Sequence, residues 1–188
     1  EFLPICLFPE RESQFGLGDG YMWSGCAVAY YKGMSDAIDA LDWFPNGDGN
    51  GLYAIFTRDG RLQDQVIISS DDEGLTWTKR IKVPQSLSGH TERIDYRDPK
   101  IFPLEKDEEK VTRWGMTLSS MNLSRAFFLT STDLINWAAA GDFEFPRPEC
   151  IGVGELSDGK GNTYHYLTNK SRTYILGHMS YDPSTSKI

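Results

Sequence analysis

A turn motif that occurs twice, 60 residues apart, constrains the fold of this chain more than any other feature of the sequence. In each copy an apolar run leads into Ser-x-Asp, and a Trp follows four or five residues after the Asp. The copies span residues 66–77 and 126–137. The Asp of such a turn can accept backbone N–H bonds, and the Trp can pack against the neighbouring strand. The motif therefore predicts a hairpin turn and not a catalytic group.

The rest of the chain consists mainly of short runs of β-forming residues, separated by clusters of Gly, Asp and Asn. We expect one short helix, at 34–41. The runs predicted as strands are 27–31, 52–57, 65–69, 113–118, 126–130 and 163–168. Many short strands at regular spacing predict an all-β sandwich, barrel or propeller.

The repeat favours the propeller. Its first copy, Ser70-x-Asp72-x-Gly74-x-Thr76-Trp77, matches the Asp-box pattern of several propeller families. A repeat of this length suits a four-stranded blade with long loops, so 188 residues make roughly three blades. Closed propellers usually have about 4–8 blades. We therefore expect the chain to be part of a longer protein, or to assemble with another chain.

Composition excludes several functional classes. The net charge is −8, whereas a surface that binds nucleic acid needs clustered Lys and Arg. The densest basic stretch, 79–82, is predicted to be a solvated strand. No apolar run is long enough for a transmembrane helix, so we expect neither a nucleic acid nor a membrane as partner. Aromatic residues make up 13% of the chain, which favours β structure or a carbohydrate site.

No cofactor or metal is expected. Three histidines lie far apart, and three cysteines have neither metal-type spacing nor the even number of a disulfide framework. These residues are His90, His165, His178, Cys6, Cys26 and Cys150. The first residues do not form a signal peptide, and two acceptor triplets, 122–124 and 169–171, are compatible with a secreted, glycosylated protein.

Two carboxylates differ from the acidic background. Asp98 stands between Arg97 and a proline, and Glu149 precedes Cys150 and the apolar, glycine-rich stretch 151–154. A carboxyl in apolar surroundings has a raised pKa and can act as a general acid, which we expect of Glu149. On spacing alone, both residues also fit ordinary turns.

Seven segments resemble glycoside hydrolase family 32, the invertase, inulinase and levanase family, both in their sequences and in their order along the chain. The most specific are Tyr-Arg-Asp-Pro-Lys-Ile-Phe and, about fifty residues later, Glu-Cys; Ser-Gly-Cys-Ala-Val precedes both. The matching segments are 3–9, 23–28, 51–57, 70–79, 96–102, 131–137 and 149–150. Together they cover nearly the whole chain.

This resemblance implies a five-bladed β-propeller, usually followed by a β-sandwich, that cleaves β-fructofuranosides such as sucrose, inulin or levan with retention of configuration. By the family's motifs, Glu149 is the acid/base and Asp98 stabilises the transition state, with Arg97 as its charged neighbour. Trp23 and Ser24 line the fructose pocket; for Trp23, a place in the core is the alternative.

The chain departs from the family pattern in two places. The family nucleophile lies in Trp-x-Asn-Asp-Pro-Asn-Gly, and only 42–47 is superficially similar. Its Asp does not adjoin the Pro and it follows the Ser-Gly segment, so we interpret it as a surface loop. We therefore expect residues 1–188 to be a partial catalytic domain that is inactive alone, without the first blade with its nucleophile, the last blade and the sandwich. After Glu-Cys, Ile151-Gly152 replaces the usual Pro-Asp, and the loss of that Asp calls the rate or the specificity into question.

Three alternatives remain open from the sequence. The protein is a fructosyltransferase of the same fold, a propeller that binds a glycan without cleaving it, or another propeller glycosidase of arabinanase or sialidase type. A sialidase needs an arginine cluster for its carboxylate substrate, and the arginines here are scattered.

Overall fold

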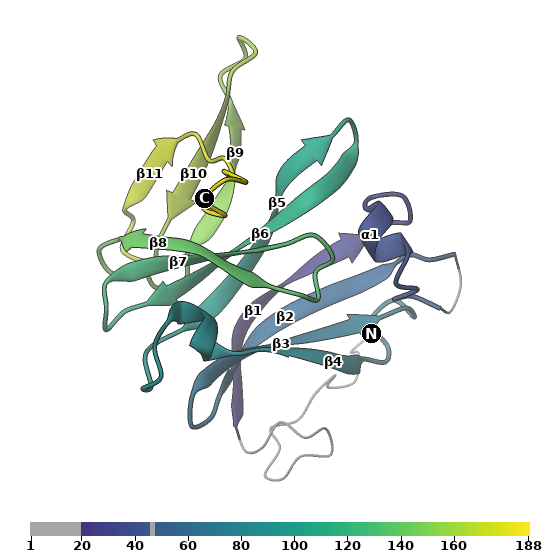
Figure 1. Cartoon of the computed structure of the whole chain (residues 1–188), viewed down its shortest axis with the longest axis horizontal. Coiled ribbons are helices and arrows are strands. Elements are labelled where there is room, and N and C mark those ends of the chain that lie inside the picture. Colours follow the sequence, from purple (N-terminus) through teal and green to yellow (C-terminus); the bar gives the residue numbers. More distant parts are fainter. Residues whose placement is uncertain (1–19, 46–47) are drawn as a thin grey trace.

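The computed structural model describes residues 20–45 and 48–188, which form three antiparallel sheets (Figure 1). Segment 3–9, part of the family resemblance, and Cys6 lie outside the described residues. Counted within this chain alone, the first blade contains β1 (Tyr21–Tyr30), β2 (Gly51–Asp59), β3 (Gln63–Ser70) and β4 (Thr78–Val83). The second contains β5 (Arg97–Asp107), β6 (Lys110–Ser120), β7 (Arg125–Ser131) and β8 (Ala138–Glu144). The third contains β9 (Gly152–Ser157), β10 (Thr163–Thr168) and β11 (Tyr174–Gly177).

Within each sheet, every strand pairs with the next one in the sequence, which is the connectivity of a propeller blade. The first strands of the sheets lie in series, because β5 contacts both β1 and β9. The prediction of an all-β propeller fragment of about three blades is confirmed. The short helix α1 (Asp36–Asp39) falls inside the predicted range, and a 3-10 turn, η1 (Gln85–Ser88), leads from β4 towards β5. No helix in the described ranges is long and apolar enough to span a membrane.

Strand β6 joins two hydrophobic clusters. Its alternate side chains Trp114, Met116 and Leu118 face the cluster between the first and second blades. On its other face, Gly115 lies against the ring of Phe102, which belongs to the cluster between the second and third blades. A Cβ at Gly115 would come within 2.4 Å of that ring, so the close packing depends on glycine.

The prediction that segment 42–47 is a surface loop is wrong for its aromatic residues. Trp43 and Phe44 are buried in the first cluster, where the ring of Phe44 stacks on Tyr30 with centroids 5.6 Å apart. The segment has no regular secondary structure at 43–45, but its aromatic residues anchor the loop to the core and do not face solvent. Asn46 and Gly47 lie outside the described residues.

Both copies of the repeated turn form the same hydrogen-bonded device. In the first, the Asp72 carboxylate accepts bonds from the N–H and hydroxyl of Thr76, and the Trp77 indole donates to the Gly74 carbonyl. In the second, Asp133 accepts the N–H of Asn136, and the Trp137 indole donates to the Leu134 carbonyl. The turns are structural, as the motif predicted.

Removing the carboxylate of the second turn is expected to destabilise the protein in a pH-dependent way. Burial, the largest single effect, raises the pKa of Asp133, but hydrogen bonds from Asn136, Ile135 and Ser131 together outweigh it and lower the pKa. A lowered native pKa stabilises the fold above the unfolded value of about 3.9, and this contribution disappears as the pH falls through the native pKa. We expect Asp133→Ala to cost about 1 kcal/mol at neutral pH.

Thermal unfolding between pH 7 and pH 2.5 checks this expectation. The difference in unfolding midpoint between Asp133→Ala and the wild type should shrink as the pH falls. Glu109→Ala, in the exposed turn between β5 and β6, is the control and should change little. A difference independent of pH contradicts the proposed role of the carboxylate.

Candidate active site

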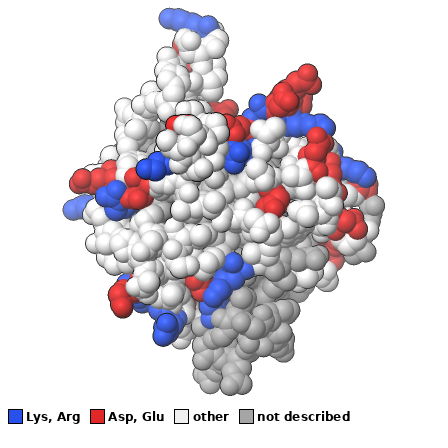
Figure 2. Space-filling model, viewed as in Figure 1, with Lys and Arg blue, Asp and Glu red and all other residues white. Residues whose placement is uncertain are grey.

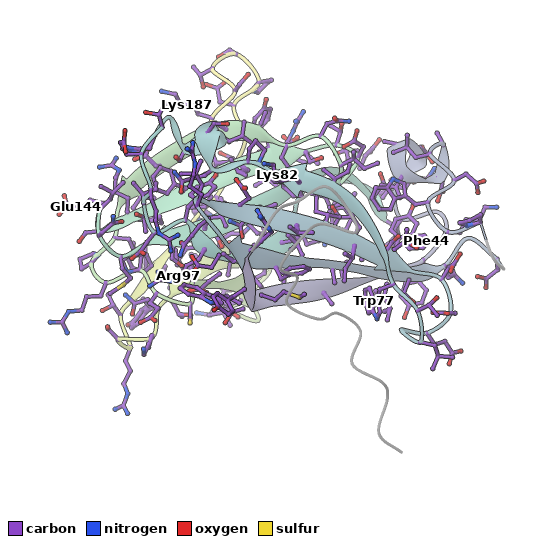
Figure 3. The ribbon with its side chains drawn as sticks, turned by 90° about the horizontal axis from the view of Figure 1, so that it is seen from below. Phe44, Trp77, Lys82, Arg97, Glu144 and Lys187 are labelled. Carbon is purple, nitrogen blue, oxygen red and sulfur yellow. The ribbon has the colours of Figure 1, made fainter. Side chains whose placement is uncertain are left out.

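The predicted site residues lie where the first strands of the three blades begin. Trp23 and Ser24 are near the start of β1, Arg97 and Asp98 open β5, and Glu149 stands just before β9. Figure 3 shows Arg97 near one end of the first sheet, with Phe44 and Trp77 towards the other. The candidate site and the repeated turn of the first blade are therefore at opposite ends of the strands.

Trp23 is exposed and packs against the largely buried side chain of Arg97. The Arg97 guanidinium lies over the Trp23 ring, 5.5 Å from its centroid, and Trp23 remains 42% exposed. The alternative in which Trp23 belongs to the core is therefore wrong. Ser24 is also exposed, at the point where the pairing register of β1 shifts between Met22 and Gly25. An open aromatic face backed by a cation offers a stacking surface for a sugar.

Arg97 bonds more closely to Asp95 than to Asp98. Its Nη1 lies 2.7 Å from Asp95 Oδ1, whereas its Nε is 3.9 Å from Asp98 Oδ2. The expectation of a charged neighbour for Asp98 holds, but Asp95 shares the charge of Arg97. Asp95 is not among the site residues predicted from the sequence, although it stands only two residues before Arg97.

Asp98 is held in an unusual backbone conformation. Its φ is 60°, in the left-handed region that residues with a Cβ rarely adopt. Its N–H donates to Thr57 Oγ1 at 3.0 Å, and its carboxylate Oδ2 accepts the N–H of Cys150 at 3.1 Å. This last bond ties the Asp98 side chain to the residue that follows Glu149, so the two predicted carboxylates belong to one site.

Glu149 is paired with a lysine. Its Oε2 lies 2.9 Å from Lys170 Nζ, and its carbonyl accepts the Lys170 N–H at 2.9 Å. The Lys170 hydrogen bond is the main cause of a lowered pKa of Glu149; slight burial opposes it, and the charges of Lys170 and Arg97 add to it. The expectation of a raised pKa is wrong, because the side chain is still 28% exposed and meets a cation instead of an apolar pocket.

Replacing Lys170 by Met is expected to move the pH profile of activity upwards. Without the ammonium group, the pKa of Glu149 rises, so the carboxyl keeps its proton to higher pH. The alkaline limb of kcat/KM, which reports loss of the proton from a general acid, should shift to higher pH. Lys160→Met is the control, because Lys160 is exposed in the turn between β9 and β10, away from Glu149. In this variant the alkaline limb of the kcat/KM profile should stay at the wild-type pH. An unmoved limb in Lys170→Met contradicts the pairing.

The triplet 169–171, which the sequence suggested as a glycosylation acceptor, has a structural role. Asn169 is buried, its amide nitrogen donates to the Pro146 carbonyl at 2.8 Å, and its side-chain oxygen accepts the Thr173 N–H. An acceptor amide must be accessible, so this asparagine is unsuited to modification. Instead it fixes the loop from which Lys170 reaches Glu149.

Two of the three cysteines are described, and both are free thiols. Cys26 Sγ accepts the Ile101 N–H at 3.3 Å, and Cys150 is exposed beside the site. On the face drawn in Figure 2, positive and negative side chains are interspersed and form no extended basic patch. Among the described residues of this face, the charges are too mixed to form a phosphate-binding surface.

The fold and the site together define a class. Propeller blades whose first strands begin beside Asp98, Glu149 and the Trp23–Arg97 pair are typical of the glycoside hydrolase propellers. The model of the glycosyl hydrolases family 32 N-terminal domain matches residues 1–185, and the chain belongs to this family.

Characterised relatives agree with that family. The chain is 32% identical to the levanase of Bacillus subtilis over 159 residues, which is 84% of the chain and 20% of the levanase. It is 27% identical to the fructan beta-fructosidase of Streptococcus mutans over 175 residues, or 93% of the chain and 11% of that protein. The chain thus spans a fifth or less of the length of these relatives.

Solved structures share the fold. The exo-inulinase of Aspergillus awamori superposes with a TM-score of 0.65 at 23% identity, covering 98% of this chain and 40% of the inulinase. A mutant of the family 32 beta-fructofuranosidase of Bombyx mori, in complex with sucrose, gives a TM-score of 0.51 at 20% identity. This match covers 99% of the chain and 38% of that enzyme.

Proposed function

We propose that the protein containing this chain is a retaining glycoside hydrolase that cleaves terminal β-fructofuranosyl linkages of sucrose or of fructans such as inulin and levan. The observation that carries the proposal is the bond between Asp98 Oδ2 and the Cys150 N–H, which ties the Asp98 carboxylate to the backbone next to Glu149; the Trp23–Arg97 pair lies beside Asp98. The names of the two curated relatives, a levanase and a fructan beta-fructosidase, support this substrate class.

The residues take the following roles in this proposal. Glu149 protonates the leaving oxygen in the first step and, once ionised, removes a proton from water in the second. Asp98 accepts hydrogen bonds from fructose hydroxyls, and these bonds strengthen as positive charge develops on the sugar ring in the transition state. Trp23 and Ser24 line the pocket, and Arg97 holds its charge between Asp95 and Asp98.

Retention also requires a nucleophilic carboxylate, about 5–5.5 Å from the acid/base. The family motif that supplies it, Trp-x-Asn-Asp-Pro-Asn-Gly, does not occur among these 188 residues. We propose that the nucleophile comes from polypeptide beyond this chain, in the same protein or in another protomer, and that the 188 residues alone give no turnover.

The test is an assay of the full-length protein on sucrose, inulin and levan, with the anomeric form of the first product followed by NMR. We expect β-fructofuranose to appear before mutarotation. Release of the α-anomer contradicts the double displacement. Transfer of fructose to a sugar instead of water identifies a fructosyltransferase.

A glycan-binding propeller without activity is the second candidate, and two observations favour it. Lys170 lowers the pKa of the acid, and Ile151-Gly152 stands where the family usually has Pro-Asp. Sugar binding without turnover by the full-length protein supports this candidate and contradicts the first.

A further inference from the structure

Three buried polar side chains of the first blade reach across to the backbone of the second blade. Thr57 on β2 and Gln63 and Gln65 on β3 are each at most 1% exposed. Buried polar groups require hydrogen-bond partners, because leaving them unpaired away from water costs free energy. Here the partners are backbone groups of the segment that carries Arg97 and Asp98.

The contacts surround that segment on both sides of Arg97. The Tyr96 N–H donates to Gln63 Oε1 at 2.7 Å, and the Tyr96 carbonyl accepts from Gln65 Nε2 at 2.6 Å. The Asp98 N–H donates to Thr57 Oγ1 at 3.0 Å. The Thr57 hydroxyl in turn donates to Gln65 Oε1 at 2.8 Å, so the contacts form one connected network.

A further buried glutamine extends the network to the chain that precedes the site. Gln85 Oε1 accepts the N–H groups of Gln63 and Ile94, and its Nε2 donates to the Glu92 carbonyl at 2.8 Å. The approach from Glu92 to Asp98 is therefore held by side chains at several successive points. Such a network fixes a backbone path more closely than apolar packing does.

The backbone at Asp98 needs this support. A non-glycine residue at a φ of 60° adopts a disfavoured conformation, which persists only where the surroundings determine it. In this conformation the Asp98 N–H points to Thr57 while the carboxylate reaches the Cys150 N–H. Releasing the N–H allows the residue to relax and the carboxylate to turn away from the neighbouring blade.

We propose that Thr57, Gln63 and Gln65 are positioning residues that act through the backbone of Tyr96 and Asp98 to aim the Asp98 carboxylate at the substrate. The inference deepens the proposed function and rests on it. A role in stability alone predicts that Thr57→Val destabilises the protein, because the buried Asp98 N–H loses its partner, but that the folded variant keeps its activity. What apolar residues cannot supply is a fixed direction for the Asp98 N–H.

The experiment compares Thr57→Val with Thr57→Ser in the full-length protein. Valine keeps the shape but removes the acceptor of the Asp98 N–H, whereas serine keeps the hydroxyl. We expect kcat/KM of Thr57→Val to fall about 10- to 100-fold, the usual effect of misplacing a catalytic group by about 1 Å. Thr57→Ser should recover most of the loss.

Thr117→Val is the matched control. Thr117 on β6 is equally buried, and its hydroxyl has no hydrogen-bond partner among the described residues. Removing this hydroxyl should leave kcat/KM unchanged. If Thr57→Val fails to fold, Gln63→Met, which removes the acceptor of the Tyr96 N–H, replaces it with the same expected loss.

Two further readouts separate the failure of this inference from the failure of the proposed function. Hydrogen exchange of the peptide that covers Tyr96 and Asp98 should be faster in Thr57→Val than in the wild type and Thr57→Ser, whether or not the protein turns over substrate. Fructose binding, measured by calorimetry, should weaken in the same variant. A wild type without turnover overturns the proposed function alone. Unchanged exchange and unchanged fructose binding in Thr57→Val overturn the positioning role.

Discussion

Replacing Glu149 by Gln is expected to lower kcat of the full-length protein by about 10²- to 10⁴-fold while sugar binding survives. The amide has nearly the shape of the carboxyl but can neither protonate a leaving oxygen nor accept a proton from water, and general acid–base catalysis contributes a factor of this size. Kinetics on sucrose and calorimetry with fructose measure the two parts separately. Glu144→Gln, on an exposed side chain of β8 (Figure 3), is the matched control.

The leaving group provides a second check on Glu149. A substrate with a good leaving group, such as a nitrophenyl fructoside, needs little protonation in the first step, so Glu149→Gln should lose less activity on its first turnover than on sucrose. Equal losses on both substrates show that Glu149 acts in another way. Full activity of the variant on sucrose removes Glu149 from the mechanism.

Asp98→Asn should cost about 10²- to 10³-fold in kcat/KM, comparable to removing a preorganised group that stabilises the transition state. The asparagine oxygen can still accept the Cys150 N–H, so the backbone should stay in place while the negative charge is lost. In the proposed mechanism this charge faces a developing oxocarbenium ion, so we expect kcat to fall more than KM rises.

The control for Asp98→Asn is Asp107→Asn, an exposed aspartate at the far end of the same strand. It should retain wild-type kinetics. A rise in KM at unchanged kcat in Asp98→Asn shows that Asp98 binds the ground state and the transition state equally, which contradicts its assignment as a transition-state stabiliser.

The sequence predicted the strands with longer runs of β-forming residues, and it missed β5, β8, β9 and the four-residue β11. The basic stretch 79–82 was expected to be a strand and lies in β4. In contrast, β5 contains Pro99 and Pro103, which ordinarily argue against a strand. The structure accommodates them with register shifts between Arg97 and Lys100 and between Pro103 and Glu105.

The sequence predicted those site residues that lie in motifs of the family. Trp23, Asp98 and Glu149 were all identified from segments that resemble the family, and the structure places them at the beginnings of successive blades. Lys170 was not identified, because nothing in its local sequence relates it to a carboxylate 21 residues earlier. The sign of the pKa shift of Glu149 was wrong for the same reason, since it depends on that contact through space.

The candidate active site depends on how the second and third blades pack against each other. Asp98 opens the second blade and Cys150 leads into the third, so one hydrogen bond between them crosses the seam. The strands of each blade pair only with one another, and their ladders can persist if the seam opens. We therefore expect a change that separates the second blade from the third to break the contact between Asp98 and the residue next to Glu149 while the hydrogen bonds within each sheet remain.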